Sequence, residues 1–155
     1  MSVLAPIIAQ GRYVQAVHLL RRMSGFHVLD IPVVSQVVEN GFPDIAGHVS
    51  MHMKTGDTRE AFRADLMRRM KGEEKLAFFY RCCYLPCCVT GSVFFAASTH
   101  MSNLQSTMFF TGSLGLLWVS KCSYEALQDC TRRHDCLQKG IWNIEESQGK
   151  WKDGI

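Results

Sequence analysis

The chain contains a stretch of 39 residues, between Arg81 and Lys121, that has no Asp, Glu, Lys or Arg. His100 is the only basic side chain in it, although 20% of the whole 155-residue chain is charged. Soluble helices normally keep one polar face in water. A charge-free stretch of this length therefore favours a segment that lies in a membrane.

The stretch is long enough for a two-helix transmembrane hairpin. Crossing the hydrocarbon core takes about 20 helical residues, and residues 76–97 and 104–120 would supply the two spans. The turn, 98–103, is polar and uncharged. Basic residues precede the first span and follow the second: Lys54, Arg59, Arg63, Arg68, Arg69, Lys71 and Lys75, then Lys121, Arg132, Arg133 and Lys139. Because the turn has no Lys or Arg, the positive-inside rule places both termini on one side.

Small residues in both spans predict close helix packing, because they allow two backbones to approach. These residues are Gly91, Ser92 and Ala96 in the first span and Thr111, Gly112 and Gly115 in the second. We expect the phenylalanines to face lipid or a neighbouring subunit. Arg81 would reach the headgroups or pair with a partner's carboxylate. Pro86 should kink or break the first span.

Residues 1–74 predict an amphipathic helical region. Apolar residues recur at helical spacing over 6–23, which predicts one helix. Asp30 followed by Pro32 predicts the start of a second helix, which would end at Asn40. Further helices are predicted over 43–53 and 57–72, with Gly72 as the stop.

Two segments of this region resemble each other. Residues 11–23 and 56–70 each begin with Gly, have Ala five residues later and end in Arg-Arg-Met. They are similar to the second helix of tetratricopeptide or pentatricopeptide repeats. Two partial copies are fewer than the three that a solenoid needs, so we interpret them as ordinary amphipathic helices. A soluble helical-repeat adaptor is the alternative to a membrane protein.

The C-terminal region, 122–155, predicts a helix over 123–137 that ends at Gly140. An extended tail would follow from Ile141. Tryptophan is a favoured anchor on partner surfaces, so Trp142 and Trp151 predict that a neighbouring protein holds this tail.

The residues that could carry chemistry do not form a recognised site. Cys82, Cys83, Cys87 and Cys88 lie as adjacent pairs and lack the CxxC spacing of common metal sites. Packing as small apolar residues is the favoured interpretation; lipidation near the membrane edge, or a membrane thiol or metal protein, are the alternatives. His48 and His52 lack a third ligand. We expect no enzyme activity, cofactor, metal or small-molecule substrate, and a net charge of +3 is too small to indicate nucleic acid.

The N-terminal segment indicates a mitochondrial location. Asp30 is the first acidic residue, and Arg12, Arg21 and Arg22 come before it among apolar residues. An arginine-bearing, acid-free amphipathic start is typical of mitochondrial targeting segments. Both termini would then lie on the matrix side of the inner membrane.

Together these features predict a structural accessory subunit of a multi-subunit inner-membrane complex. The architecture resembles the small two-span supernumerary subunits around respiratory complexes, with a complex I-like host favoured, or around ATP synthase. The predicted contacts to partner subunits or to a phospholipid such as cardiolipin are Arg68, Arg69, Lys75, Arg81, Lys121, Trp142 and Trp151.

Overall fold

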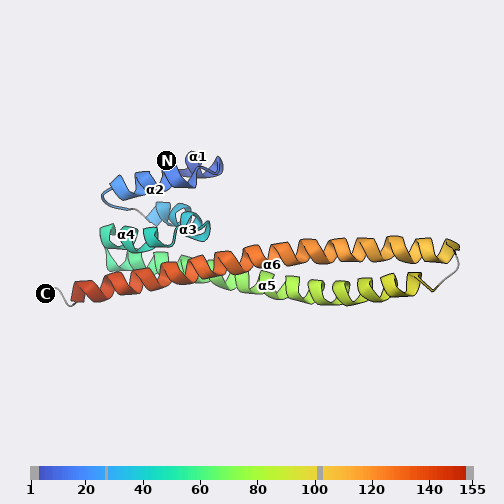
Figure 1. The fold of residues 1–155 in the computed structure, drawn as a ribbon. Coiled ribbons are helices and arrows are strands. Elements are labelled where there is room, and N and C mark those ends of the chain that lie inside the picture. Colours follow the sequence, from blue (N-terminus) through green and yellow to red (C-terminus); the bar gives the residue numbers. More distant parts are fainter. Residues whose placement is uncertain (1–3, 27, 101–102, 153–155) are drawn as a thin grey trace. The chain divides into compact units, whose positions relative to one another are not determined.

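The computed structural model describes residues 4–26, 28–100 and 103–152, and it confirms the predicted all-α class: short N-terminal helices are followed by two long helices that pack together (Figure 1). The elements are α1 (Leu4–Ala9), α2 (Tyr13–Arg22), the 3-10 turn η1 (Val28–Asp30), α3 (Ile31–Glu39), α4 (Asp44–His52), α5 (Gly56–Ser98) and α6 (Asn103–Lys152). The chain divides into two compact units: the first contains residues 1–73 and 132–155, and the second contains 74–131. Both long helices contribute to both units.

Glycines separate the short helices of the first unit. The helical pattern over 6–23 is divided into α1 and α2 at Gly11, which has a φ of +70° that other residues rarely adopt. The predicted start of α3 is confirmed, with Pro32 in its first turn and Asp30 before it. This helix ends at Glu39, and Gly41 follows with a φ of +109°. These breaks let successive short helices reverse and pack on one another.

The two long helices pass through three positions that were predicted to stop or bend a helix. Gly72 lies inside α5 and Gly140 inside α6, so both predicted ends are wrong. Pro86 also lies inside α5, which continues to Ser98. A glycine inside a helix costs only about 1 kcal/mol relative to alanine. Packing of the flanking apolar residues can offset that cost.

The predicted extended tail is wrong as well, because α6 continues to Lys152. Leu137, Ile141 and Ile144 recur at helical spacing, and all three are buried in the first unit. This apolar stripe needs a helix in order to face one core. Trp151 lies within α6, but its side chain is outside the described part.

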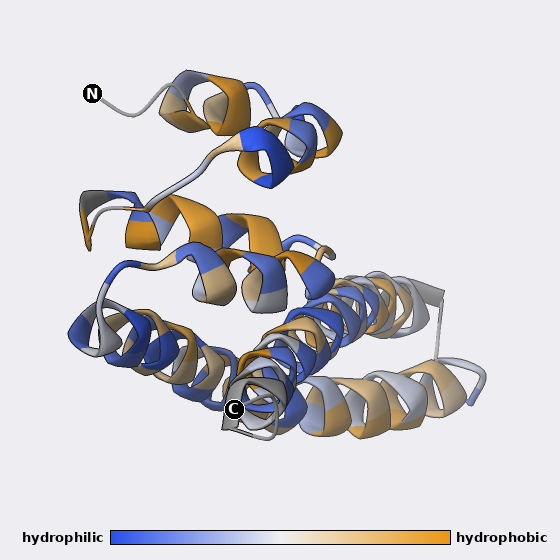
Figure 2. Ribbon diagram, turned by 90° about the vertical axis from the view of Figure 1, so that its left-hand side faces the viewer, coloured by the Kyte–Doolittle hydropathy of each residue, from blue (hydrophilic) through white to orange (hydrophobic). Residues whose placement is uncertain are grey.

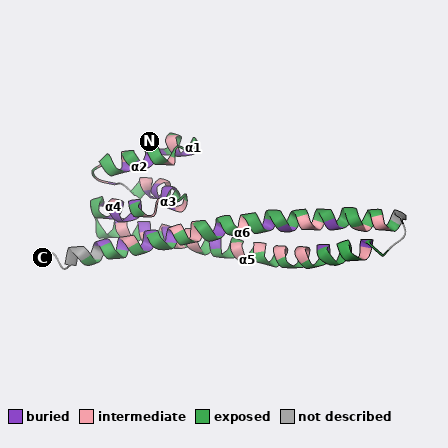
Figure 3. Cartoon of the chain, in the orientation of Figure 1, coloured by how far each residue is buried: buried purple, intermediate pink, exposed green. Residues whose placement is uncertain are grey.

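All the short helices, together with the unit's portions of α5 and α6, enclose one apolar core. Figure 2 shows hydrophobic and hydrophilic residues on different faces of these helices, and Figure 3 shows buried residues on each of them. The core consists of Leu4, Ile8, Ala16, Val17, Leu20, Phe26, Ile31, Val34, Val37, Val38, Ile45, Ala46, Val49, Met53, Phe62, Leu66, Leu137, Ile141 and Ile144.

Polar contacts join α6 to α4 within this unit. The hydroxyl oxygens of Ser50 and Ser147 are 2.8 Å apart and buried. The Asn143 Nδ2 donates to the Pro43 carbonyl at 3.1 Å. Gly47 allows this approach, because an added Cβ there would lie 3.2 Å from the Asn143 carbonyl oxygen. The C-terminal part of α6 is therefore an integral part of the N-terminal helical unit.

Candidate functional site

The second unit is an antiparallel hairpin of α5 and α6, and its register follows from a series of contacts. Near the open end, Tyr84 lies opposite Ser120 and Tyr124: the Ser120 hydroxyl donates to the Tyr84 carbonyl at 3.4 Å, and the two tyrosine ring centroids are 5.4 Å apart. Near the turn, the Ser106 hydroxyl donates to the Ser98 carbonyl at 2.6 Å. The expected position of the turn is thus confirmed, since α5 ends at Ser98 and α6 begins at Asn103.

Contacts between these two ends keep the same register. The ring centroids of Phe94 and Phe109 are 5.3 Å apart. An added Cβ at Gly91 would lie 3.2 Å from the Leu116 Cβ and from the Leu117 Cγ. The helices therefore approach closely at Gly91.

The buried side chains between these helices are mostly serines. Ser98, Ser113, Ser120 and Ser123 are each at most 9% exposed, and Ser106 is half-buried. Ser106, Ser113 and Ser120 recur every seven residues, the repeat that keeps one face of a helix toward a partner helix. The Ser98 and Ser113 hydroxyls each donate at 2.7 Å to a carbonyl three residues earlier in their own helix. The fully buried side chains of the hairpin are therefore small, and the half-buried Tyr84, Phe109, Leu116 and Leu117 complete the contact between the two helices.

Large apolar side chains lie on the outer surface of the hairpin. Of the 18 large hydrophobic residues that are exposed in the described part of the chain, 14 belong to residues 74–131. They are Leu76, Phe78, Phe79, Leu85, Val89, Val93, Phe94, Phe95, Met108, Phe110, Leu114, Trp118, Val119 and Tyr124. A helical hairpin in water would bury such residues and expose its serines. In this hairpin the large apolar residues are exposed, although Phe94, Phe95, Phe110 and Tyr124 also meet an aromatic ring of the other helix.

The two ends of the charge-free stretch lie at the same level of the hairpin. Arg81 precedes Tyr84 by three residues, and Lys121 directly follows Ser120, which contacts Tyr84. From this level to the turn, α5 has 17 residues and α6 has 18. At 1.5 Å per residue, these segments are about 25 Å and 27 Å long. The hydrocarbon core of a bilayer is about 30 Å thick.

One described helix, α5, is long and apolar enough to cross a membrane by the criteria of length and composition. Only 6% of its most apolar segment is buried, whereas the core helix of a soluble protein would be mostly buried. Helix α6 does not pass the same test. Its hairpin portion is diluted by Gln105, Thr107, Thr111 and the serines of the inner face.

Of the six residues predicted to pack the spans together, Gly91 is buried against α6. The other five are exposed: Ser92, Ala96, Thr111, Gly112 and Gly115. Of these, Gly112 still faces α5, because an added Cβ would lie 4.0 Å from a ring carbon of Phe94. Thr111 and Gly112 line an open groove of about 370 Å³ with Thr107 and Met108. The inner serines were missed, although the seven-residue spacing of Ser106, Ser113 and Ser120 could have revealed them.

Most of the residues predicted to contact lipid or partners are exposed. Arg81 and Lys121 are exposed beside the ends of the charge-free stretch, and Arg68 and Lys75 are exposed on α5. Trp142 is 62% exposed on α6. The sequence interpretation missed Trp118, which is 68% exposed and lies three residues before Lys121. Tryptophan beside a basic residue is typical of a membrane interface.

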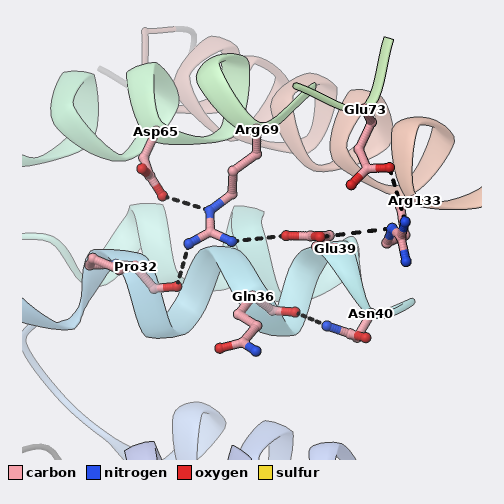
Figure 4. A network of polar contacts seen from close by, with 8 residues as sticks. All are labelled: Pro32, Gln36, Glu39, Asn40, Asp65, Arg69, Glu73 and Arg133. Carbon is pink, nitrogen blue, oxygen red and sulfur yellow. Dashed lines mark hydrogen bonds and ion pairs between the residues drawn. The ribbon is translucent and has the colours of Figure 1, made fainter. Parts of the chain in front are cut away.

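Arg69 is engaged inside the first unit instead (Figure 4). Its guanidinium donates to Asp65 at 3.0 Å, to Glu39 at 2.9 Å and to the Pro32 carbonyl at 3.2 Å. Burial alone would lower the pKa of Arg69, but the hydrogen bonds to both carboxylates outweigh it and raise the pKa above its ordinary value.

Arg133 extends the same network from α6. It pairs with Glu73 at 3.2 Å and lies 3.9 Å from Glu39. The network thus has five charged side chains that connect α3 with both long helices: Glu39 on α3, Asp65, Arg69 and Glu73 on α5, and Arg133 on α6.

The cysteines differ in their exposure. Cys82 and Cys122 are exposed, Cys83, Cys87 and Cys88 are half-buried, and Cys130 is 1% exposed. Packing therefore accounts for Cys130 but not for Cys82 and Cys122. Among the described residues, no three His, Cys, Asp or Glu side chains come together as a potential metal site.

An open pocket of about 310 Å³ lies between α4 and α6 in the first unit, lined by Asp44, Gly47, His48, Met51, Asn143, Glu146 and Ser147. Burial is the main cause that lowers the pKa of His48, and the nearby His52 adds to it. The ring centroids of His48 and His52 are 4.5 Å apart.

No protein-family model, curated protein or solved structure matches this chain.

Proposed function

We propose that this protein is a structural, non-catalytic subunit of a large complex in the mitochondrial inner membrane. Residues 76–97 and 104–120 form a transmembrane hairpin whose polar turn reaches the far side. The first helical unit stays on the matrix side, together with both termini. The hairpin packs on other membrane helices, and the helical unit binds a neighbouring subunit through surfaces that include Trp142.

The observation that carries this proposal is the reversed distribution of side chains in the hairpin. Most of the fully buried side chains of the hairpin are serines, whereas most of its phenylalanines and valines are exposed, together with Leu76, Leu85, Leu114 and Trp118. Leu116 and Leu117 are half-buried beside Gly91. Lipid is as apolar as these outer side chains, so exposing them costs little there, and small residues at the inner face favour helix association. In water, the same surface would be a large apolar patch prone to association.

The basic residues support an anionic membrane surface as a partner. Lys75, Arg81 and Lys121 are exposed near the ends of the charge-free stretch, where phospholipid headgroups would lie. Each basic residue near such a surface contributes about 1 kcal/mol of attraction. Cardiolipin, with two phosphates, is the anionic lipid proposed for the inner membrane.

The mitochondrial location rests on the arginine-bearing segment before Asp30. This segment includes α1 and α2, and six of its residues lie in the core of the first unit: Leu4, Ile8, Ala16, Val17, Leu20 and Phe26. The proposal therefore retains the segment in the mature protein as part of the fold.

A soluble helical adaptor is the second candidate. It is favoured by the composition of α6, which does not pass the test for a membrane span. The packing of α1 with α2 and of α3 with α4 would also suit an adaptor built from helix pairs. The apolar outer face of the hairpin would then require a protein partner.

A lysine on the outer face distinguishes the two candidates. Val89 is 63% exposed near the middle of the span, and a lysine in the middle of a membrane helix costs about 2.5–3.5 kcal/mol of insertion free energy. We expect Val89→Lys to shift the chain from the carbonate-resistant membrane fraction toward the carbonate-extracted fraction. For a soluble adaptor, the same change would leave the fractionation unchanged or improve solubility.

Met51→Lys is the matched control, because Met51 is 46% exposed in the first unit, outside both the proposed spans and the arginine-bearing segment. It should leave the membrane fraction unchanged. Native gel electrophoresis of the wild-type chain in mild detergent would then identify its host through co-migration with one large complex. A wild-type chain that carbonate releases as a small soluble species would rule out the membrane proposal.

A further inference from the structure

The hairpin presents two exposed cysteines in equivalent settings on its two helices. Each directly follows a basic residue, as Arg81-Cys82 on α5 and Lys121-Cys122 on α6. Both thiols are exposed, whereas the neighbouring Cys83, Cys87 and Cys88 are half-buried.

The hairpin register places these cysteines at the same level. Tyr84 lies opposite Ser120 and Tyr124, as the 3.4 Å hydrogen bond and the 5.4 Å ring separation show. Cys82 precedes Tyr84 by two residues, and Cys122 lies midway between Ser120 and Tyr124. Both thiols are therefore within about one helical turn of the same height. That height is the boundary between the charge-free stretch and the charged segments.

We propose that Cys82 and Cys122 are sites of S-acylation by long-chain fatty acyl groups, which anchor the open end of the hairpin in the membrane leaflet. This inference rests on the proposed membrane hairpin. Cysteines at the edge of a membrane span are the usual positions for this modification. Cys122 follows the second proposed span by two residues, and Cys82 lies six residues inside the first, next to Arg81, whose charge would stay at the headgroups. An acyl chain attached at the charge boundary can enter the hydrocarbon beside the outer apolar side chains.

The reaction is a thioester exchange with a fatty acyl-coenzyme A. The cysteine sulfur attacks the acyl carbonyl carbon and forms a new carbon–sulfur bond. The bond between that carbon and the sulfur of coenzyme A breaks, and coenzyme A leaves as a thiol with the proton that the cysteine gives up. No oxidant or reductant is needed. Arg81 and Lys121 would attract the phosphates of the donor.

The test is acyl exchange on the full chain in its native membranes. Free thiols are blocked with N-ethylmaleimide, thioesters are cleaved with neutral hydroxylamine, and the released thiols are tagged with polyethylene glycol maleimide. We expect two hydroxylamine-dependent tags on the wild type and one on Cys82→Ser or on Cys122→Ser. The double variant should carry none.

Cys136→Ser is the control, because Cys136 lies on α6 outside the proposed span, and it should keep both tags. Tags that persist in the double variant would overturn the inference. Tags that appear after treatment with a phosphine reductant, without hydroxylamine, would also overturn it, because they indicate disulfides. A carbonate-resistant chain without tags would refute acylation alone. A chain that carbonate extracts would refute the membrane hairpin, and acylation at this boundary with it.

Discussion

Gly140 lies where α6 crosses the short helices of the first unit. An added Cβ would be 2.6 Å from the Val38 Cγ1 and 3.5 Å from the Ala46 Cβ. Neither neighbour is the end of a flexible side chain, so relief of the clash requires a shift of the backbone. Glycine at this position therefore sets how closely α6 can approach α3 and α4.

We predict that Gly140→Ala lowers the free energy of unfolding of the first unit by about 1–3 kcal/mol, the usual cost of overpacking. Urea denaturation of the full chain in mild detergent measures this change. Gly72→Ala is the control, because nothing lies within 4 Å of its added Cβ. It should raise stability by about 0.5–1 kcal/mol through helix propensity. Equal effects of the two variants would contradict the close approach at Gly140.

Arg69 connects α5 to α3 through charges that are largely out of water. The side chains of Glu39 and Asp65 are each only 18% exposed. Arg69→Met would leave Asp65 without this partner and Glu39 with only the longer contact to Arg133. We expect a loss of about 1–3 kcal/mol, the cost of leaving a buried acceptor without its donor.

Amide hydrogen exchange of α3 and α5 measures the effect of Arg69→Met. The matched control is Glu145→Gln, which removes an ion pair with Arg63 whose side chains are 42% and 47% exposed. That pair should contribute no more than about 1 kcal/mol. If protection of α3 stayed at the wild-type level in Arg69→Met, the network would not stabilise the unit.

At the scale of elements, α5 and α6 depend on the small residues of the inner face. Gly91 contacts Leu116 and Leu117, whereas the added Cβ of Gly115 would meet nothing within 4 Å. Both glycines belong to the predicted packing set, but only Gly91 faces the other helix. They therefore form a matched pair for testing the hairpin register.

We predict that Gly91→Val destabilises the hairpin by about 1–3 kcal/mol, because the added methyl groups must push the helices apart. Gly115→Val should leave the hairpin packing unchanged. Hydrogen exchange of residues 84–98 in mild detergent reports the difference. Faster exchange in Gly115→Val than in Gly91→Val would show that the helices face each other through the other side of α6.

At the scale of the whole molecule, the first unit is made from both ends of the chain. Leu137, Ile141 and Ile144 belong to its core although they follow the charge-free stretch by more than ten residues. Removing one such side chain typically costs 2–5 kcal/mol. The loss of all three is comparable to the total stability of a small domain, about 5–15 kcal/mol.

A chain that ends at Thr131 should therefore lose the folded state of residues 4–73. Limited proteolysis of the full and truncated chains in mild detergent measures this, and we expect rapid cleavage of the N-terminal helices in the truncated form. Trp142→Ala is the control, because Trp142 is 62% exposed and outside the core. Protease resistance in the truncated chain would show that the N-terminal helices fold without α6.

The sequence by itself determined the helical class, the position of the turn and the bounds of α3, because these depend on local properties. Charge depletion, helical periodicity and the Asp30–Pro32 start act within a few residues. The sequence did not determine which faces of α5 and α6 meet. Ser92 and Ser113 are chemically alike, yet one is exposed and the other buried, because the angle at which two helices face each other depends on all their contacts together.

Only the tertiary structure decided where α5 and α6 continue and what α6 packs against. Gly72, Gly140 and the segment after Ile141 carry local signals for a helix end or a loose tail. Each signal is weak, at about 1 kcal/mol per glycine, and burial of Leu137, Ile141 and Ile144 in a core from the other end of the chain outweighs it. Contacts between residues so far apart in sequence leave no local pattern, so their effect appears only once the chain has folded.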